Sequence, residues 1–236
     1  MAAGERALIV GAGAGLSASL ARCCARDGMS VVLAARDTQK LAALAQETGA
    51  RTVACDARDA AEVERLFAAI DAGGERLDLV VYNASGRARG PIVELDPEAV
   101  ENAIRVTAFG GFLVARQAAS RMLRQGHGTI LFTGASASVK GYPRSSSFAM
   151  GKFALRGLAQ SLARELQPQN IHVGHIVIDG GIGRPGDPRT QERAGGRGPD
   201  ALLDPDAIAE TYLQLHRQHR SAWAWEIELR PWVETF

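Results

Sequence analysis

Short apolar segments alternate with alanine-rich amphipathic segments along most of the chain, and this alternation limits the fold more than any single motif. The amphipathic segments, such as residues 38–48 and 59–70, carry apolar residues at helical spacing. The apolar segments are typical of buried strands and cover residues 6–10, 30–35, 51–55, 77–83, 128–134, 171–178 and 223–229. Repeated strand–helix units predict a single α/β domain over residues 1–236, a doubly wound, three-layer fold around a parallel sheet of about seven strands.

One segment breaks this rhythm. Residues 179–200 are rich in glycine, proline and arginine and have no apolar period. A loop this long inside a compact domain is usually functional or disordered. We therefore expect residues 179–203 to form a loop on the substrate side, followed by a helix from about Pro205 to His216.

The composition limits the compartment and the partners. The 236 residues include 22% charged residues and carry a net charge of +1, which gives no long-range attraction to nucleic acid or to an anionic membrane. Charges interrupt the apolar residues near the amino end, unlike in a signal peptide or a spanning helix. Cys23, Cys24 and Cys55 are odd in number and lack metal-ligand spacing, which indicates reduced thiols in a cytoplasm.

The five histidines predict no metal site. His172 and His175 lie three residues apart on an expected strand, so they should point to opposite faces and share no ion. His216 and His219 lie near the end of an expected helix, where a place on the protein surface is the favoured interpretation.

A glycine-rich turn follows the first expected strand. Gly11, Gly13 and Gly15 stand between that strand and a helix opening, so the backbone there can approach a pyrophosphate closely. Ser17 is the small residue where this helix meets the strand. The alternative is a tight turn with a purely structural role, which becomes less favoured because the turn follows the first strand of a doubly wound order.

The ends of the second and third strands carry charges that discriminate between cofactors. Ala35 supplies no carboxylate for a ribose 2′-hydroxyl, whereas Arg36 supplies a cation for a 2′-phosphate, so NADP is favoured over NAD. A solvated arginine at a strand end is the alternative. Asp56 is a candidate for contact with the adenine amino group, whereas Asp59 better fits the N-cap of the next helix.

These features together resemble the short-chain dehydrogenase/reductase family over essentially the whole chain. The motifs that carry the resemblance are GAGAGLS at 11–17, CDARD at 55–59, VYNASG at 81–86 and the helix that begins FAMGKFALRG at 148. The resemblance implies a Rossmann fold and an NAD(P)-dependent oxidoreductase acting on a carbonyl or an alcohol. The positions that it implies for cofactor binding are Gly11, Gly13, Gly15, Leu16, Arg36, Asp56, Ala57, Asn83, Ala84, Ser85, Lys152, Gly180 and Ile182.

The chain departs from this family at the catalytic positions. Family members use a tetrad of Asn, Ser, Tyr and Lys, and the resemblance places Thr107, Ala135, Phe148 and Lys152 at these four positions. Phenylalanine neither donates nor accepts a proton. Because general acid–base catalysis contributes about 10²–10⁴-fold, its loss harms hydride transfer without having to abolish it. Lys152, one helical turn from Phe148, retains a role in binding the nicotinamide ribose.

Three nearby groups are candidates for the missing acid. Ser136 follows Ala135, and a hydroxyl bonded to the loop backbone is the favoured alternative. Tyr142 lies in a Gly-Tyr-Pro sequence that is better explained as a turn. Asp179 ends a buried strand at the sheet edge where such folds bind ligands, although Asp-Gly is equally a turn sequence. The candidate catalytic residues are therefore Lys152, Asp179 and Ser136.

Two functions remain open at this stage. The first is an NADP-dependent oxidoreductase with a displaced acid and an unknown small-molecule substrate; the second is a non-catalytic NADP-binding protein that uses the fold as an interaction surface. Four loop arginines flank the expected site, and they either favour an acidic substrate or are solvated loop charges: Arg87, Arg89, Arg184 and Arg189.

The helix that carries Lys152 is apolar on more than one side. Phe153, Ala154 and Gly157 lie away from its core face, and such a helix is buried on more than one side. In the resembling family this helix and the segment at 108–119 pair across a two-fold axis, so we expect a homodimer or a homotetramer.

Overall fold

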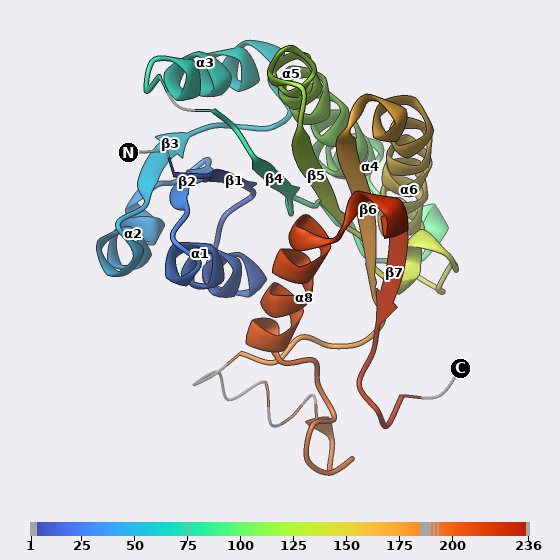
Figure 1. Cartoon of the computed structure of the whole chain (residues 1–236). Coiled ribbons are helices and arrows are strands. Elements are labelled where there is room, and N and C mark those ends of the chain that lie inside the picture. The colour runs from blue at the N-terminus through green and yellow to red at the C-terminus, as the bar shows by residue number, and fades with distance from the viewer. Residues whose placement is uncertain (1–3, 75, 185–189, 191, 193, 235–236) are drawn as a thin grey trace.

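Seven parallel strands form one central sheet in the computed structural model, which describes residues 4–74, 76–184, 190, 192 and 194–234 (Figure 1). The strand order is β3-β2-β1-β4-β5-β6-β7. The strands are β1 (Arg6–Val10), β2 (Ser30–Ala35), β3 (Arg51–Ala54), β4 (Leu79–Tyr82), β5 (Gly128–Thr133), β6 (Ile171–Ile178) and β7 (Glu226–Leu229). The predicted doubly wound sheet of about seven strands is confirmed.

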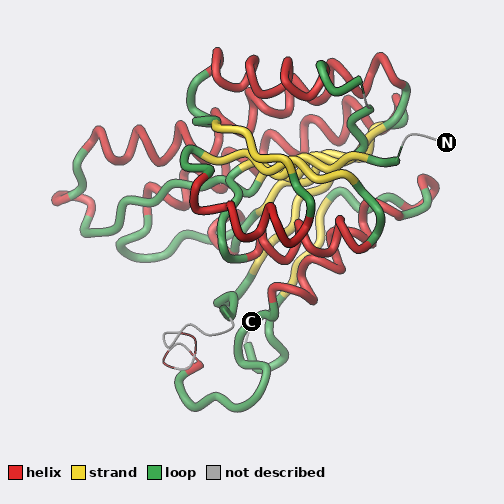
Figure 2. Tube along the Cα trace, turned by 90° about the vertical axis from the view of Figure 1, so that its left-hand side faces the viewer, coloured by secondary structure: helices red, strands yellow, loops and turns green. Residues whose placement is uncertain are grey.

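Helices cover both faces of this sheet, as the edge-on view shows (Figure 2). One face is covered by α1 (Leu16–Arg26), α2 (Ala42–Thr48) and α8 (Pro205–Arg217). The other face is covered by α3 (Ala60–Asp71), α5 (Gly110–Gln125) and α6 (Ser146–Leu166), while α4 (Pro97–Ile104) packs against α6. The five inner strands are buried on both faces, which explains why their sequences are almost continuously apolar, whereas the edge strands β3 and β7 are partly exposed.

Short polar signals set the helix boundaries. The Asp59 carboxylate accepts a 3.0 Å hydrogen bond from the Glu62 amide, so Asp59 is the N-cap of α3, as the sequence predicted. Asp204 caps α8 in the same way, and Pro205 follows at the first helical position. At the other end of a helix, Gly126 stops α5 in the left-handed conformation with φ of 79°.

The topology creates a crevice at one edge of the sheet. All strands are parallel, so their carboxyl ends share this edge. From β1 the chain adds strands β2 and β3 on one side and then returns to add β4 on the other side. The connections leaving β1 and β4 therefore diverge, and open α/β sheets bind their ligands at such a switch point.

The structure corrects the expectations at the carboxyl end of the chain. The last strand covers only Glu226–Leu229, because Trp223 lies outside it and stacks on the His172 ring at 4.8 Å. The expectation that His216 lies on the surface is wrong. Its side chain is 7% exposed, and its Nδ1 lies 2.9 Å from the Thr129 hydroxyl, because α8 packs this residue against β5. His219 lies beyond the end of α8 and is exposed.

Several observations bear on partners and redox state. In the described part of the chain, no helix combines the length and the hydrophobicity needed to cross a bilayer. In the same part of the chain, no group of three or more His, Cys, Asp or Glu side chains is placed to hold a metal ion.

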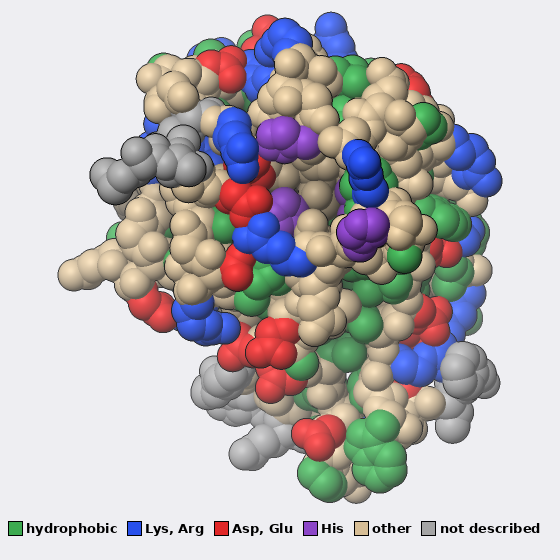
Figure 3. All heavy atoms as spheres, in the orientation of Figure 1, with side chains coloured by type: hydrophobic (Ala, Val, Ile, Leu, Met, Phe, Trp, Pro, Cys, Tyr) green, Lys and Arg blue, Asp and Glu red, His purple; other side chains and the backbone are tan. Residues whose placement is uncertain are grey.

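The three cysteines are free and buried, and burial raises the pKa of Cys55 to about 11. On the face drawn in Figure 3, acidic and basic side chains are interspersed.

Candidate functional site

Two adjoining cavities, of about 480 and 730 Å³, lie along the switch point and together form one cleft. Every residue predicted to bind the cofactor lines this cleft. Gly11, Gly13, Asn83 and Ser85 line both cavities; Gly15, Leu16, Lys152, Gly180 and Ile182 line the smaller one; Arg36, Asp56, Ala57 and Ala84 line the larger one. Residues from six separate segments of the sequence therefore meet at one edge of the sheet.

The glycine-rich turn approaches the loop after β4 so closely that a side chain would not fit. Gly11 has φ of +82°, and a Cβ added there would lie 2.4 Å from the Ala84 backbone nitrogen. The amides of Gly11 and Ala12 both donate to the Ala34 carbonyl, which fixes the turn against the end of β2. The turn is thus built from backbone, as the approach of a bulky charged ligand requires.

The amino end of α1 opens onto the smaller cavity. Gly15 is its N-cap and offers no side-chain hydrogen bond to the first turn, so backbone N–H groups and the positive end of the helix dipole face the cleft. Asn83 donates a 2.7 Å hydrogen bond to the Ser17 hydroxyl, and Ser17 donates to the Gly11 carbonyl. Asn83 thereby ties the loop after β4 to the glycine-rich turn.

Charged side chains gather around the end of β2 in the larger cavity. Arg36, Asp37 and Lys40 all line it, and Lys40 lies 3.0 Å from the Asp37 carboxylate. Among the residues that the structure describes, Arg36 forms no ion pair of its own. Sequence reasoning missed Asp37 and Lys40, although their i, i+3 spacing directly after Arg36 was the available signal.

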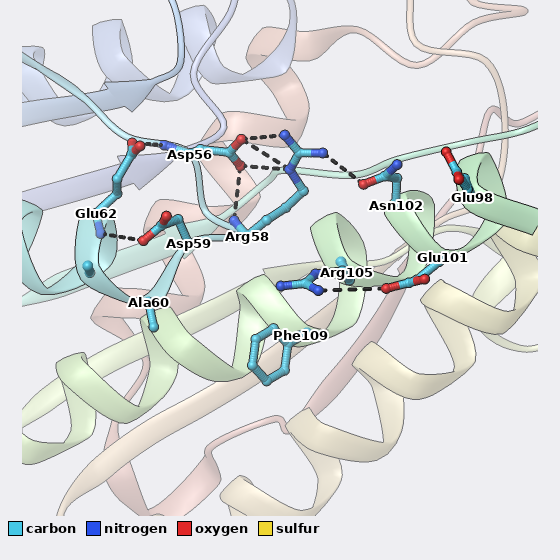
Figure 4. A pocket seen from close by; sticks show the side chains of 11 residues that line it. Asp56, Arg58, Asp59, Ala60, Glu62, Glu98, Glu101, Asn102, Arg105 and Phe109 are labelled. Carbon is cyan, nitrogen blue, oxygen red and sulfur yellow. Dashed lines mark hydrogen bonds and ion pairs between the residues drawn. The ribbon is translucent and has the colours of Figure 1, made fainter.

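Asp56 is held by a neighbour that the sequence analysis did not consider. The Arg58 guanidinium contacts the Asp56 carboxylate at 2.6 Å and donates a 2.9 Å hydrogen bond to Asn102 at the end of α4 (Figure 4). The hydrogen bond from Arg58 is the main reason that the pKa of Asp56 is lowered. Asp56 therefore lines the cleft as a carboxylate that forms an ion pair with Arg58.

Lys152 lies on the floor of the smaller cavity with 3% of its surface exposed. Its Nζ donates a 2.6 Å hydrogen bond to the carbonyl oxygen of Thr133 at the end of β5. Burial, and secondarily the charge of Arg87, lowers the pKa of Lys152 to about 7. A lysine with a pKa in this range can exchange a proton at neutral pH.

Phe148 and Ala135 line the same cavity as Lys152, and the Lys152 Nζ lies 5.7 Å from the centre of the Phe148 ring. Thr107 does not line it. Thr107 is fully buried in a π-helical segment between α4 and α5 (Arg105–Phe109), and its hydroxyl oxygen accepts a 2.9 Å hydrogen bond from the Gly86 amide.

The comparisons with known proteins agree with this architecture. The family described as short chain dehydrogenase matches residues 5–182. The chain belongs to this family. A solved short-chain dehydrogenase from Rhodopseudomonas palustris is 35% identical, with a TM-score of 0.82 over 97% of this chain and 99% of that one. A metagenomic short-chain oxidoreductase in complex with NADP is 27% identical, with a TM-score of 0.83 over 97% of this chain and 98% of that one.

Curated relatives of the short chain dehydrogenase family carry out oxidation and reduction. The 3-oxoacyl-[acyl-carrier-protein] reductase MabA of Mycobacterium tuberculosis is 28% identical over 190 residues, which cover 79% of this chain and 74% of that protein. D-threitol dehydrogenase of Mycolicibacterium smegmatis is 29% identical over 178 residues, which cover 73% of this chain and 68% of that protein. This short chain dehydrogenase is accordingly an NAD(P)-dependent oxidoreductase.

Two candidate catalytic residues of this short chain dehydrogenase lie outside the cleft lining. Asp179, 6% exposed, pairs with Arg230 at 3.0 Å and with Lys140 at 3.4 Å. Its carboxylate joins β6 to the segment after β7, and Asp179 lines neither cavity of the cleft. Ser136 opens the short turn after β5 and does not line either cavity of the cleft. Of the three candidates, only Lys152 lies in the cleft.

The loop arginines separate into three kinds. Arg87 lines both cavities and Arg184 lines the smaller one, where a Cβ at Gly15 would lie 3.6 Å from the Arg184 Nε. Arg89 is exposed and lines neither cavity, and Arg189 lies outside the described residues, as do 185–188, 191 and 193 of the predicted substrate-side loop. The described part of that loop is held by pairing of Ile182 with Leu203.

Proposed function

We propose that this short chain dehydrogenase transfers hydride between NADP(H) and a carbonyl or alcohol, with Lys152 as the group that exchanges the proton. The observation that carries the proposal is a single cleft with a cationic strand end, Arg36, at one extremity and a buried lysine at the other. A relative solved with NADP supports the choice of cofactor.

The residues of the cleft fit a dinucleotide. The close approach of Gly11 to Ala84 and the uncapped first turn of α1 suit a pyrophosphate, and Arg184 lies over the same turn. Arg36 suits a 2′-phosphate because its guanidinium keeps its charge at every physiological pH and presents several N–H donors. Asn83, through its hydrogen bond to Ser17, holds the loop after β4 against the glycine-rich turn.

Reduction of a carbonyl consumes one hydride and one proton. NADPH held by the residues of this cleft would supply the hydride to the carbonyl carbon. Lys152 gives a proton to the carbonyl oxygen and regains it from solvent; in the direction of oxidation it accepts the proton from the alcohol. Phe148 keeps water from one wall of this end, because its ring is 8% exposed and lines the cavity beside Lys152.

A screen for NADPH oxidation with aldehydes and ketones, combined with direct titration of NADPH and NADH, tests this function. We expect binding of NADPH and turnover with a subset of carbonyl compounds. Tight binding of NADPH without oxidation by any carbonyl in the panel would favour the non-catalytic NADP-binding alternative. Failure of both cofactors to bind would contradict both.

Arg36→Ala should remove the preference for NADPH over NADH. Charge-assisted hydrogen bonds to a 2′-phosphate contribute about 1.5–3 kcal/mol, which corresponds to a preference of about tenfold to a hundredfold. The measurement is the ratio of the two dissociation constants in the native protein and the variant. Arg26→Ala, which removes an exposed arginine at the end of α1, is the matched control and should leave the ratio unchanged. A native protein with equal affinities would refute the assignment of Arg36.

We also expect this chain to assemble as a homodimer or homotetramer through α5 and α6. Phe112 on α5 and Phe153 on α6 are 43% and 45% exposed, and Phe109 stacks on Phe112 at 6.1 Å. Aromatic side chains left on a helix surface are typical of subunit interfaces. Sedimentation should show an oligomer at micromolar concentration and a monomer for the double variant Phe112→Glu, Phe153→Glu. Val93→Glu, at an apolar residue of another surface segment, should stay oligomeric.

A further inference from the structure

Arg87 is stacked on an aromatic ring at the reacting end of the cleft. Its guanidinium carbon lies 3.6 Å from the centre of the Phe148 ring, which is the distance of a close cation–π contact. Both side chains line the smaller cavity together with Lys152. A stacked guanidinium contacts the ring with its flat face, while its N–H donors lie in its plane and suit a carboxylate in bidentate geometry.

The backbone on both sides of Arg87 is fixed by buried hydroxyl groups. The Gly86 amide donates to the Thr107 hydroxyl oxygen at 2.9 Å. The Ala88 amide donates to Ser147 at 3.0 Å, and the Ser147 hydroxyl donates back to the Ala88 carbonyl at 2.7 Å. Thr107 and Ser147 are fully buried, so the loop at 86–88 is anchored to the π-helical segment and to the start of α6. The backbone that carries Arg87 is thereby positioned before any ligand binds.

Among the described residues that line this end of the cleft, the charged side chains are all basic. Arg87, Lys152 and Arg184 line the smaller cavity, and the described residues of its lining include no carboxylate. Asp179, the acid that ends β6, is instead paired with Arg230 and Lys140. The positive charge of Arg87 adds to burial in lowering the pKa of Lys152, so an anion bound between these cations would relieve an unfavourable interaction.

Two of these cations have different places along the cleft. Arg184 lies beside Gly15, at the turn that suits the cofactor's pyrophosphate. Arg87 lines both cavities and lies over Phe148, at the end that contains Lys152. The cation over Phe148 is therefore placed for the substrate.

We infer that the substrate carries a carboxylate and that Arg87, stacked on Phe148 and anchored through Thr107 and Ser147, binds it. This inference rests on the proposed oxidoreductase function and gives its substrate class, an oxo acid or the corresponding hydroxy acid. The carboxylate forms an ion pair with Arg87, while the carbonyl group lies towards Lys152.

Matched pairs of acids and esters test the inference by calorimetry on the protein saturated with NADP⁺ at pH 7. The probes are benzoylformate with its methyl ester and 4-acetylbenzoate with its methyl ester, which hold the carboxylate at a short and a long distance from the carbonyl. We expect at least one acid to bind about tenfold to a hundredfold more tightly than its ester. Equal binding of acid and ester in both pairs, including no binding of either, would overturn the inference.

Three variants separate recognition by Arg87 from a general effect of charge. Arg87→Gln should abolish the preference for the acid, and Arg87→Lys should retain a part of it because the charge stays but the planar fork is lost. Arg89→Gln, two residues along the same loop and outside the cleft lining, should keep the full preference. An unchanged preference in Arg87→Gln would overturn the assignment of this residue.

The affinity for NADP⁺, measured first in each variant, distinguishes a failure of the proposed function from a failure of the inferred substrate class. Native protein that does not bind NADP⁺ contradicts the proposed function itself. Native protein that binds NADP⁺ but shows no preference for an acid contradicts only the substrate class. If Arg87→Gln loses affinity for NADP⁺ as strongly as for the acid, Arg87 belongs to the cofactor site and the inference fails.

Discussion

Lys152→Met is expected to abolish carbonyl reduction and, at the same time, to raise the free energy of unfolding at neutral pH. The loss of activity should be at least about 10²-fold, because the variant lacks the proposed proton donor at the reacting end of the cleft. The gain in stability follows from the burial of the ammonium, whose pKa falls from the usual 10.5 to about 7. That difference corresponds to at most about 5 kcal/mol.

The size of this gain in stability depends on pH, because the folded and the unfolded chain release the lysine proton at different pH values. The unfolded chain keeps the lysine proton up to about pH 10, whereas the folded chain releases it near pH 7. Between these values the unfolded state binds more protons, so the stability of the native protein rises with pH, and below pH 7 the whole cost of burying the charge is present. The variant lacks this dependence. Because methionine leaves the Thr133 carbonyl without its donor, we expect a net gain of about 1–3 kcal/mol at pH 7 or below.

Chemical denaturation of the native protein and the variant at pH 6, 7.5 and 9 measures this effect. The stability difference should be largest at pH 6 and smallest at pH 9. Lys140→Met is the control, since Lys140 is half-exposed and lies outside the cleft. A variant that keeps its reductase activity would refute the role of Lys152 as proton donor, and a variant that is less stable at every pH would refute the account of its burial.

Much of the fold followed from local sequence patterns. The inner strands are buried on both faces and almost continuously apolar, so they were recognisable from the sequence, and together with the edge strand β3 they were predicted within one or two residues of their ends. The turn at Gly11 was equally accessible, because only glycine fits at φ of +82° with Ala84 so close. The last strand was predicted too long because tryptophan is a residue type that is common in strands. Trp223 instead packs on His172 before the strand begins.

The reacting end of the cleft depends on contacts between distant segments, and these leave no local signal. Asp179 has the right position at the end of a strand, yet its partner Arg230 lies 51 residues away and gives it a structural ion pair. In the sequence, Arg87 cannot be distinguished from an ordinary loop arginine, because its contact with the Phe148 ring is formed only in the folded chain. Two positions that deviate from the expected tetrad, Thr107 and Phe148, contact the same loop. The deviations are therefore better explained as one altered site than as independent losses.

Phe148→Tyr combined with Ala135→Ser is expected to raise carbonyl reduction by about tenfold or more, within the range of an added general acid. Both native side chains line the cavity that contains Lys152, so both new hydroxyl groups would enter it. A phenol there gains a lowered pKa from Lys152 and Arg87, and its ring keeps the stacking contact with Arg87. The serine hydroxyl would hold the substrate oxygen towards that phenol.

The two substitutions should act together, because a phenol without a held substrate oxygen, or a held oxygen without an acid, completes only half of the arrangement. Steady-state rates of NADPH oxidation by the native protein, the single variants and the double variant give the interaction between the positions, and the double variant should exceed the product of the single effects. Additive effects would indicate that the hydroxyl groups act separately. A rate that falls in Phe148→Tyr would show that the native site, with Lys152 as its acid and Phe148 as a platform for Arg87, works better without a phenol.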